Sequence, residues 1–402
     1  MPITAFSASR KMELDVEQLL TQLATETGFG SLAKGAPIPD SWKEHFSTDL
    51  ECSSCFCTGA EVVRASKSKV DGHNVRQAYF RFPQSETSAG HHPFCDFSGN
   101  VSAGFIPENL VQFSSAKDGV SRAVRDLVCK GIELKVFNQW DIRRMREWFF
   151  RTKLESQFTV TLDPRLPGWL DDLQRRASYN YYEREQEPIE LTPEVLRIPG
   201  FRFEIAAIKE ISLRYRPILD MAREKRLYSG AMRDRLEKLA TEYGGKSVFD
   251  PTTLQKQFER TNRFASFMCN NHPPLSRHSK AHSPLGSLKN PKPLLAFAAL
   301  LLFISDWNLN VAVSQFALLA TSELQPDESL GNVMGLNPFH DFPAWAMLKN
   351  MQELPPFEIP SVSVKAEVDA WIVEAKQKAG LQRSIEVQSG PLVSLGEEPD
   401  LF

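Results

Sequence analysis

The alternation of apolar and polar residues along the chain is mainly typical of helices. In Met12–Thr27 the apolar residues recur at helical spacing, and Gly28 follows as a stop signal. The longest apolar run, residues 294–304, is much shorter than the roughly 20 residues that a membrane span requires, so it predicts a buried helix. Further helices are predicted in residues 119–131, 139–158, 167–187, 204–227, 230–243, 252–268, 310–324 and 364–383.

Two short stretches rich in Val, Tyr and Phe predict a β-hairpin in the N-terminal quarter. They are residues 60–66 and 75–82, and Asp71-Gly72 between them is a turn signal. A further short strand is predicted in residues 132–137. We therefore expect an α+β fold that is mainly α. Its predicted parts are a small hairpin module in residues 1–105, a larger helical body in residues 106–385 and a flexible tail in residues 386–402.

Cysteine and histidine residues gather on either side of the predicted hairpin. Cys52-x-x-Cys55 precedes it and His92-x-x-Cys95 follows it. Zinc prefers thiolate and imidazole ligands in a closed tetrahedron, and a C-x-x-C turn presents two sulfurs from one loop. The order of ligand pair, hairpin and ligand pair resembles a zinc ribbon. The four residues predict a structural zinc site, with His91 as an alternative to His92 and Cys57 as an alternative to either upstream cysteine.

A structural role for the zinc follows from the number of ligands and the size of the hairpin. Four strong ligands leave no coordination position for a reacting water molecule, so we do not expect a catalytic metal. A hairpin of this size buries too little apolar surface to fold alone, and zinc binding would supply its folding free energy.

A second group of potential ligands lies in residues 269–282. It consists of Cys269, His272, His278 and His282, at irregular spacing with prolines between them. The spacing favours an ordinary exposed loop over a second metal site, and the second site remains an alternative.

Charge is unevenly distributed, although the net charge of the whole chain is only -3. Residues 260–305 contain no Asp or Glu, whereas residues 306–402 carry an excess of acids. The basic stretch predicts a surface that contacts the phosphates of a nucleic acid through Arg277, Lys280, Lys289 and Lys292. The alternative is a solvated loop that faces the acidic C-terminal region. In residues 139–153, where arginines alternate with aromatic residues, we expect the aromatics in the core and the arginines in water.

One weak pattern points to an enzyme. Glu133 and Lys135 form E-x-K in the predicted strand, with Asp118 and Asp126 upstream, as in Mg²⁺-dependent nucleases of the restriction type. A zinc module that leads into such a nuclease resembles the general layout of the CoiA-like competence proteins. In the restriction-type nucleases the carboxylates hold Mg²⁺ and the lysine helps to orient the attacking water.

The hypothesis that we favour is a non-catalytic protein with structural zinc that binds nucleic acid or a protein partner. The N-terminal residues lack the apolar core of a secretory signal peptide, and clustered cysteines that bind metal suit the reducing cytoplasm, so we expect a cytoplasmic protein without a membrane partner. The alternatives are the Mg²⁺-dependent nuclease and a pure protein–protein scaffold. An accessory factor of a bacterial defence system or mobile element would fit, although no residue pattern carries that assignment.

Overall fold

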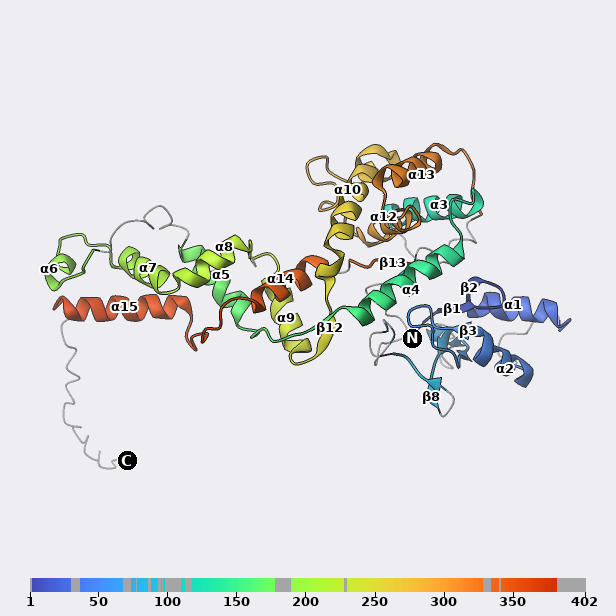
Figure 1. Ribbon diagram of the computed structural model, residues 1–402, viewed down its shortest axis with the longest axis horizontal. Coiled ribbons are helices and arrows are strands. Elements are labelled where there is room, and N and C mark those ends of the chain that lie inside the picture. The colour runs from blue at the N-terminus through green and yellow to red at the C-terminus, as the bar shows by residue number, and fades with distance from the viewer. Residues whose placement is uncertain are drawn as a thin grey trace, which may run out of the picture. The chain divides into compact units, whose positions relative to one another are not determined.

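The computed structural model divides the chain into two compact units, each built from two separate segments. It describes residues 2–29, 37–67, 74–76, 78–85, 88–92, 95, 97, 110–112, 118–177, 189–227, 230–327, 334–339 and 341–381. Unit 1 consists of Met1–Val160 and Gly245–Ala346, and unit 2 consists of Thr161–Gly244 and Met347–Phe402 (Figure 1). The boundary predicted at residues 105/106 and the predicted tail lie outside the described residues.

The described part of the chain is mainly helical, as the sequence predicts. In unit 1 the helices are α1 Val16–Glu26, α2 Asp40–Asp49, α3 Gly119–Glu133, α4 Gln139–Glu155, α10 Gln255–Asn271, α11 Pro273–Ser276, α12 Lys292–Ile304 and α13 Leu309–Thr321. In unit 2 they are α5 Leu166–Ala177, α6 Pro193–Leu196, α7 Phe203–Arg214, α8 Arg216–Glu224, α9 Arg233–Tyr243 and α15 Val364–Lys378. The division between the units falls within α14, Phe342–Gln352.

The strands are short and pair in small antiparallel sheets. They are β1 Thr4–Ser7, β2 Met12–Asp15, β3 Leu50–Glu51, β4 Glu61–Val63, β5 Ser66–Lys67, β6 Asn74–Arg76, β7 Tyr79–Arg81, β8 Gln84–Ser85, β9 Ser88–Ala89, β10 Leu110–Gln112, β11 Gln157–Thr159, β12 Ser247–Phe249 and β13 Met334–Leu336. The predicted hairpin is present, because β4 pairs with β7 and β5 pairs with β6. Its predicted turn at Asp71-Gly72 lies outside the described residues.

The first helix begins later than the sequence pattern predicts. Residues Met12–Asp15 form β2, which pairs with β1 in a three-stranded sheet of order β2-β1-β3. Asp15 then starts α1, because its side chain accepts a hydrogen bond from the Gln18 amide and the Gln18 side chain bonds back to the Asp15 amide. The helix prediction is therefore wrong for these four residues.

The predicted strand at residues 132–137 is also wrong. Residues Ile132 and Glu133 complete the last turn of α3, and Lys135 then takes a left-handed conformation with φ of 55°. The amide of Val136 donates to the Gly131 carbonyl, and the Phe137 ring lies against Gly131 at a distance that leaves no room for a Cβ atom. This is a helix C-terminus that is closed by a left-handed residue, and the apolar residues after it pack back onto the helix.

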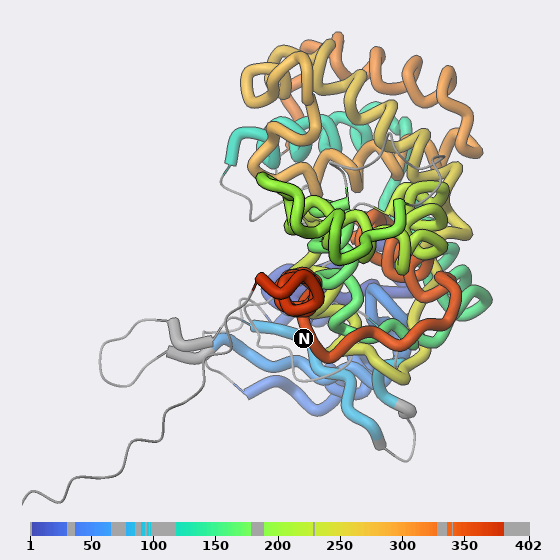
Figure 2. Tube along the Cα trace, turned by 90° about the vertical axis from the view of Figure 1, so that its left-hand side faces the viewer, coloured from blue at the N-terminus to red at the C-terminus, as the bar shows by residue number. Residues whose placement is uncertain are grey.

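The core of unit 1 is organised around α12, which is the predicted buried helix. Nearly every side chain from Pro293 to Leu302 is buried, and α12 packs against α3, α4, α10 and α13. Figure 2 shows α3, α10, α12 and α13 gathered in one group at the top of the view. The same continuous core includes Cys52, Phe80 and Cys95 from the hairpin region.

In the described residues, no single helix is long and apolar enough to cross a membrane, and only α12 and α13 taken together, bent by 118°, reach that length and composition.

Helix α4 holds the N-terminal strands through buried charges. The Arg146 side chain, which is 2% exposed, donates to Glu13 of β2 at 2.7 Å, and Glu13 also accepts from the Thr4 hydroxyl. One turn earlier, Arg143 donates to Glu51 of β3 at 2.6 Å. The expectation that the arginines of this helix face water is wrong for both residues, since their partners lie far away in the sequence and leave no local pattern.

Unit 2 is a small helical assembly with its own core. Helix α5 packs against α9, α7 and α15, and α7 packs against α15. The Trp169 ring lies edge-on to Tyr215, with ring centres 4.9 Å apart, and the Tyr215 hydroxyl donates to Glu367 of α15. A predicted continuous helix over residues 204–227 is broken at Tyr215, just before Pro217, where α7 ends and α8 begins.

We expect Arg146→Ala to lower the free energy of unfolding of unit 1 by about 3–5 kcal/mol, because it leaves the fully buried Glu13 carboxylate without its cation. The matched control is Arg144→Ala on the same helix. The Arg144 side chain is 59% exposed, and its ion pair with Asp141 is long, at 3.6 Å. This substitution should cost less than about 1 kcal/mol. Urea denaturation followed by tryptophan fluorescence measures both, and equal effects of the two substitutions would contradict the prediction.

Candidate metal centre

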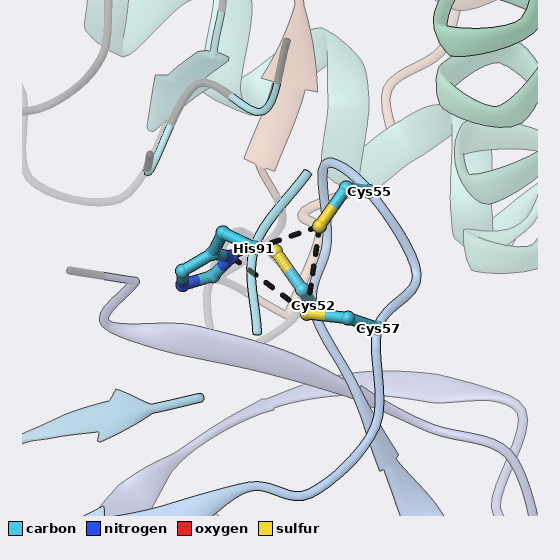
Figure 3. A group of neighbouring side chains, drawn as sticks. All are labelled: Cys52, Cys55, Cys57 and His91. Atoms are coloured by element: carbon cyan, nitrogen blue, oxygen red, sulfur yellow. Dashed lines mark hydrogen bonds between the residues drawn. The ribbon is translucent and has the colours of Figure 1, made fainter. Parts of the chain in front are cut away.

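The first cysteine pair lies in a tight turn between β3 and β4. The amide of Phe56 donates to the Cys52 carbonyl at 3.0 Å, and the amide of Cys52 donates to the Cys57 carbonyl at 2.9 Å. Phe56 adopts a left-handed conformation with φ of 62°, an unusual choice for a bulky residue. This turn brings the side chains of Cys52, Cys55 and Cys57 to the same side of the loop (Figure 3).

His91 completes a group of four potential metal ligands. The ligand atoms of Cys52, Cys55, Cys57 and His91 all lie within 4.8 Å of one another and could hold a metal ion. The Nδ1 atom of His91 is 3.6 Å from the Cys55 sulfur and 3.7 Å from the Cys57 sulfur, and Figure 3 shows these side chains turned toward one another.

Cys95 adds a fifth donor at the edge of the group. Its sulfur is 3.8 Å from the Cys52 sulfur and 3.4 Å from the His91 Nδ1 atom. In a zinc tetrahedron with Zn–S bonds of about 2.3 Å, two sulfurs lie roughly 3.8 Å apart, and a sulfur and an imidazole nitrogen lie roughly 3.6 Å apart. The observed separations therefore match the edges of such a tetrahedron.

His92, the histidine that the sequence favoured, lies outside the group of four. Its carbonyl accepts from the Cys95 amide at 2.8 Å, and its ring lies edge-on to Phe150, with ring centres 5.3 Å apart. His91, the alternative, has its ring edge-on to Phe82 and tilted against Phe97, at centre distances of 5.3 and 6.2 Å. These contacts aim His91, and not its neighbour, at the cysteines.

Backbone amides donate to two of the sulfurs. The Ser54 amide is 3.4 Å from the Cys52 sulfur, and the Phe97 amide is 3.3 Å from the Cys95 sulfur. In each case the donor lies two residues after the cysteine. Hydrogen bonds of this kind favour the negatively charged form of the sulfur, which is the form that binds a metal.

The sulfurs are held too close together to ionise all at once in the absence of a cation. Burial raises the pKa of the Cys52 thiol well above its ordinary value, and burial likewise raises the pKa of Cys95. Hydrogen bonding with Cys52 and then with the other thiols lowers the pKa of Cys55 instead. A bound divalent cation would favour the deprotonated form of these thiols, which is the form that binds a metal.

Aromatic and cationic contacts fix the metal-binding turn onto α4. The Arg143 guanidinium lies 4.9 Å from the centre of the Phe56 ring, and it also faces Phe6 and Trp140 at 5.0 Å each. The Phe56 ring meets Phe150 of α4 edge-on. The sequence analysis did not predict the contact between Arg143 and Phe56. The only sequence signal for it is the position of Phe56, an aromatic residue between Cys55 and Cys57.

The second group of potential ligands does not converge in the structure. Cys269 is fully buried at the end of α10, and burial raises its pKa to about 11. His272 is buried beside Phe316, whereas His278 and His282 are exposed, with His278 lying over Gly119. Within the described residues, Cys52, Cys55, Cys57 and His91 form the only group of ligands found.

The four cations assigned to nucleic acid lie between the end of α11 and the first residue of α12, which is Lys292. We call residues 272–292 the basic loop. Arg277, Lys280, Lys289 and Lys292 are exposed there, and among the described residues none of them forms an ion pair. The loop is held in shape by buried Leu275 and Leu288 and by serine hydrogen bonds such as that from the Lys280 amide to the Ser287 hydroxyl at 2.7 Å.

The residues of the nuclease alternative are dispersed along one helix. Asp118 caps the start of α3 by accepting from the Ser121 amide, and Asp126 pairs with Lys130 in its middle. Glu133 ends the helix, roughly 22 Å from its start by helical rise, and its side chain accepts from the Asp327 amide. The strand that the nuclease pattern requires is absent at residues 132–137, so these residues do not form the expected cleft.

Comparison of the chain with protein families, with curated proteins and with solved structures gives no match.

Burial of His272 predicts that the stability of unit 1 depends on pH. Burial lowers the pKa of His272 below its ordinary value of 6.5, and the Lys130 charge lowers it further. The unfolded chain therefore takes up the proton more readily than the folded chain does. We expect stability to be greatest above about pH 6.5 and to fall as the pH drops from there toward the folded-state pKa.

Urea denaturation between pH 7.5 and 5 measures this dependence. His272→Phe keeps an aromatic ring beside Phe316 and should lose part of the decline, whereas His282→Asn, at an exposed position, should retain it. A decline of the same size in His272→Phe and in the unsubstituted protein would show that His272 is not its source.

Proposed function

We propose that the protein is a non-catalytic, zinc-stabilised protein that binds nucleic acid. The observation that carries the zinc is the convergence of cysteine sulfurs and the His91 nitrogen at tetrahedral separations. Thiolate and imidazole donors select zinc over magnesium or calcium, which prefer oxygen. More than three such donors are available, so the protein fills the coordination sphere itself and the ion has a structural role.

The zinc would supply folding free energy to a region that has little core of its own. Between Cys52 and Phe97 the described strands are two or three residues long. The ion would tie the turn after β3 to the segment around His91 and Cys95, and would thereby close the hairpin at its base. The Phe56 ring contacts Arg143 and Phe150, and these contacts would fix the metal-bound turn against α4.

Nucleic-acid binding is supported by the contrast between two sets of cations in unit 1. Arg143 and Arg146 of α4 are committed to Glu51 and Glu13. The cations of the basic loop are exposed and free of ion pairs among the described residues. Four exposed cations within one stretch that contains no acid suit phosphate contacts.

The zinc proposal predicts different outcomes for two adjacent histidines. His91→Ala should remove the imidazole ligand, abolish retention of the ion and unfold the hairpin region. His92→Ala removes a ring that lies against Phe150 and should leave one zinc ion per chain. Native mass spectrometry of the full chain measures the zinc content. A zinc-free parent protein, or loss of zinc in His92→Ala alone, would refute this assignment.

The nucleic-acid proposal predicts salt-dependent retention of duplex DNA. If the four loop cations each neutralise one phosphate, the slope of log K against log salt is roughly -3.6. Changing Arg277, Lys280, Lys289 and Lys292 to Glu should abolish retention at low salt. The matched control changes Lys43, Arg81, Arg144 and Arg151 to Glu, which are exposed cations elsewhere in unit 1 that already have acidic partners. Equal loss in both variants would remove the basic loop as the binding surface.

A further inference from the structure

A hollow in the surface of unit 1 lies beside the turn that joins α12 to α13, and α10 packs against both helices. Its volume is about 770 Å³, within the roughly 300–1,000 Å³ that sites for small molecules occupy. It is lined by residues of α10, of the turn and of the first turn of α13, among them Arg260, Arg263, Asp306, Trp307, Asn308 and Asn310. None of these residues belongs to the metal centre or to the basic loop.

The turn holds Trp307 in the wall of the hollow at a cost in backbone strain. Asp306 and Trp307 both adopt left-handed conformations, with φ of 50° and 60°, which is rare for a bulky residue. The Trp307 amide donates to the Leu302 carbonyl at 2.7 Å, and the Arg260 side chain donates to the Trp307 carbonyl at 2.8 Å. Glycine adopts such angles without steric cost, so the turn alone does not require these two side chains. Strained residues of this kind gather at ligand sites.

Two other aromatic rings support the Trp307 indole. The ring centres of Trp148 and Phe339 lie 5.5 and 6.4 Å from that of Trp307, at interplanar angles of 50° and 73°. Neither ring is stacked flat on the indole, and the Trp307 side chain is only half-buried. An indole on a fixed support in the wall of a hollow suits the stacking of a planar ring.

The two arginines of the hollow are three residues apart on α10, so they share one face of the helix. Arg260 is held by its bond to the Trp307 carbonyl. Arg263 is exposed and forms no ion pair or side-chain hydrogen bond within the described residues. Its guanidinium is therefore available to an anionic group, and guanidinium geometry matches that of a phosphate.

Two exposed acids in the hollow narrow the class of ligand. Glu259 and Asp306 offset the charges of the two arginines, so a bare anion is attracted little. Carboxylates accept hydrogen bonds from hydroxyl groups, and the side-chain amide of Asn310 can both donate and accept at the edge of a planar ring. These groups together suit a ligand that joins one phosphate, a sugar with hydroxyl groups and a heterocyclic base.

We propose that this hollow binds a nucleotide, with the base on Trp307 and the phosphate on Arg263. The nucleotide is either free or an unpaired residue of a single strand, because both present the same base, sugar and phosphate. The site requires neither the zinc centre nor the basic loop.

Calorimetric titration of the full chain tests binding with three separate probes, which are adenosine 5′-monophosphate, a single-stranded oligoadenylate and inorganic phosphate. We expect the monophosphate or the oligonucleotide to bind, and inorganic phosphate neither to bind nor to compete. Arg263→Gln should weaken binding by at least about tenfold, because a charge-assisted contact to the phosphate is lost. The control Arg144→Gln removes an exposed cation of α4 and should bind as the parent does. Binding of the monophosphate identifies a free nucleotide, and binding of the oligonucleotide alone identifies an unpaired residue of a strand.

Tryptophan fluorescence tests the place of the base. A base stacked on Trp307 should quench part of the emission of the parent protein. Trp307→Phe keeps a ring against Trp148 and Phe339 and should lose this quenching. Trp140→Phe, at a position that is 42% exposed on α4, should retain it.

Failure of both the monophosphate and the oligonucleotide to bind would overturn the proposal, as would equal binding by Arg263→Gln and the parent. Competition by inorganic phosphate would show an anion site without recognition of a base. Quenching that is lost in Trp140→Phe and kept in Trp307→Phe would remove the base from Trp307. A protein that binds the nucleotide but neither zinc nor duplex DNA would overturn the proposed function and leave this site in place.

Discussion

The close approach of five soft donors is the constraint on which the N-terminal part of the molecule depends. Several thiols lie within hydrogen-bonding distance of one another. Burying them stabilises the fold little unless a bound cation neutralises the charge of their thiolate forms. The strands around them are too short to hold this geometry by their own ladders. The surrounding rings, Phe82 and Phe97 about His91 and Phe56 about Arg143, fix the direction of the donors rather than supply a large core.

Charged residues in unit 1 have two different uses. On α4, Arg143 and Arg146 pair with Glu51 and Glu13 of the N-terminal sheet, and removal of either arginine would leave its carboxylate without this cation. In the basic loop, cations stay in water and the backbone is fixed by turns and by two buried leucines. The first set holds the fold together, whereas the second forms no ion pair among the described residues. The difference lies in the local supply of acids, since residues 260–305 contain none.

Much of the fold and part of the candidate site could be predicted from the sequence. Helices with clear caps and apolar faces, and the hairpin of β4 and β7, follow from local patterns. The C-x-x-C spacing located Cys52 and Cys55. The spacing could not distinguish His91 from His92, because adjacent residues differ only in the direction of their side chains, and that direction is set here by Phe82, Phe97 and Phe150.

Other features depend on contacts that no local pattern records. The buried roles of Arg143 and Arg146 require Glu51 and Glu13, which lie 92 and 133 residues away in the sequence. Strand β1 is only four residues long, and its hydroxyl side chains bond to residues elsewhere in the sequence, Thr4 to Glu13 and Ser7 to Asp49. Residues 132–137 have the composition of a strand. In the structure the first two end α3, and the amides of Val136 and Phe137 bond back to the Gly131 carbonyl of that helix.

The discontinuity of unit 1 sets an order of events during synthesis. All five potential donors of the proposed zinc centre lie within the first 97 residues, whereas α12, against which α3 and α4 pack, is made about 150 residues after α4 begins. In the proposed zinc protein the nascent chain would hold the complete donor set before α12 is made, while the apolar faces of α3 and α4 still lack their partner. The bonds from Gly245 to Val160 and from Val160 to Lys246 mark the point at which the chain rejoins unit 1. A shortage of zinc in the cell would therefore impair folding of the N-terminal region, which is the earliest step of assembly, before most of the chain is synthesised.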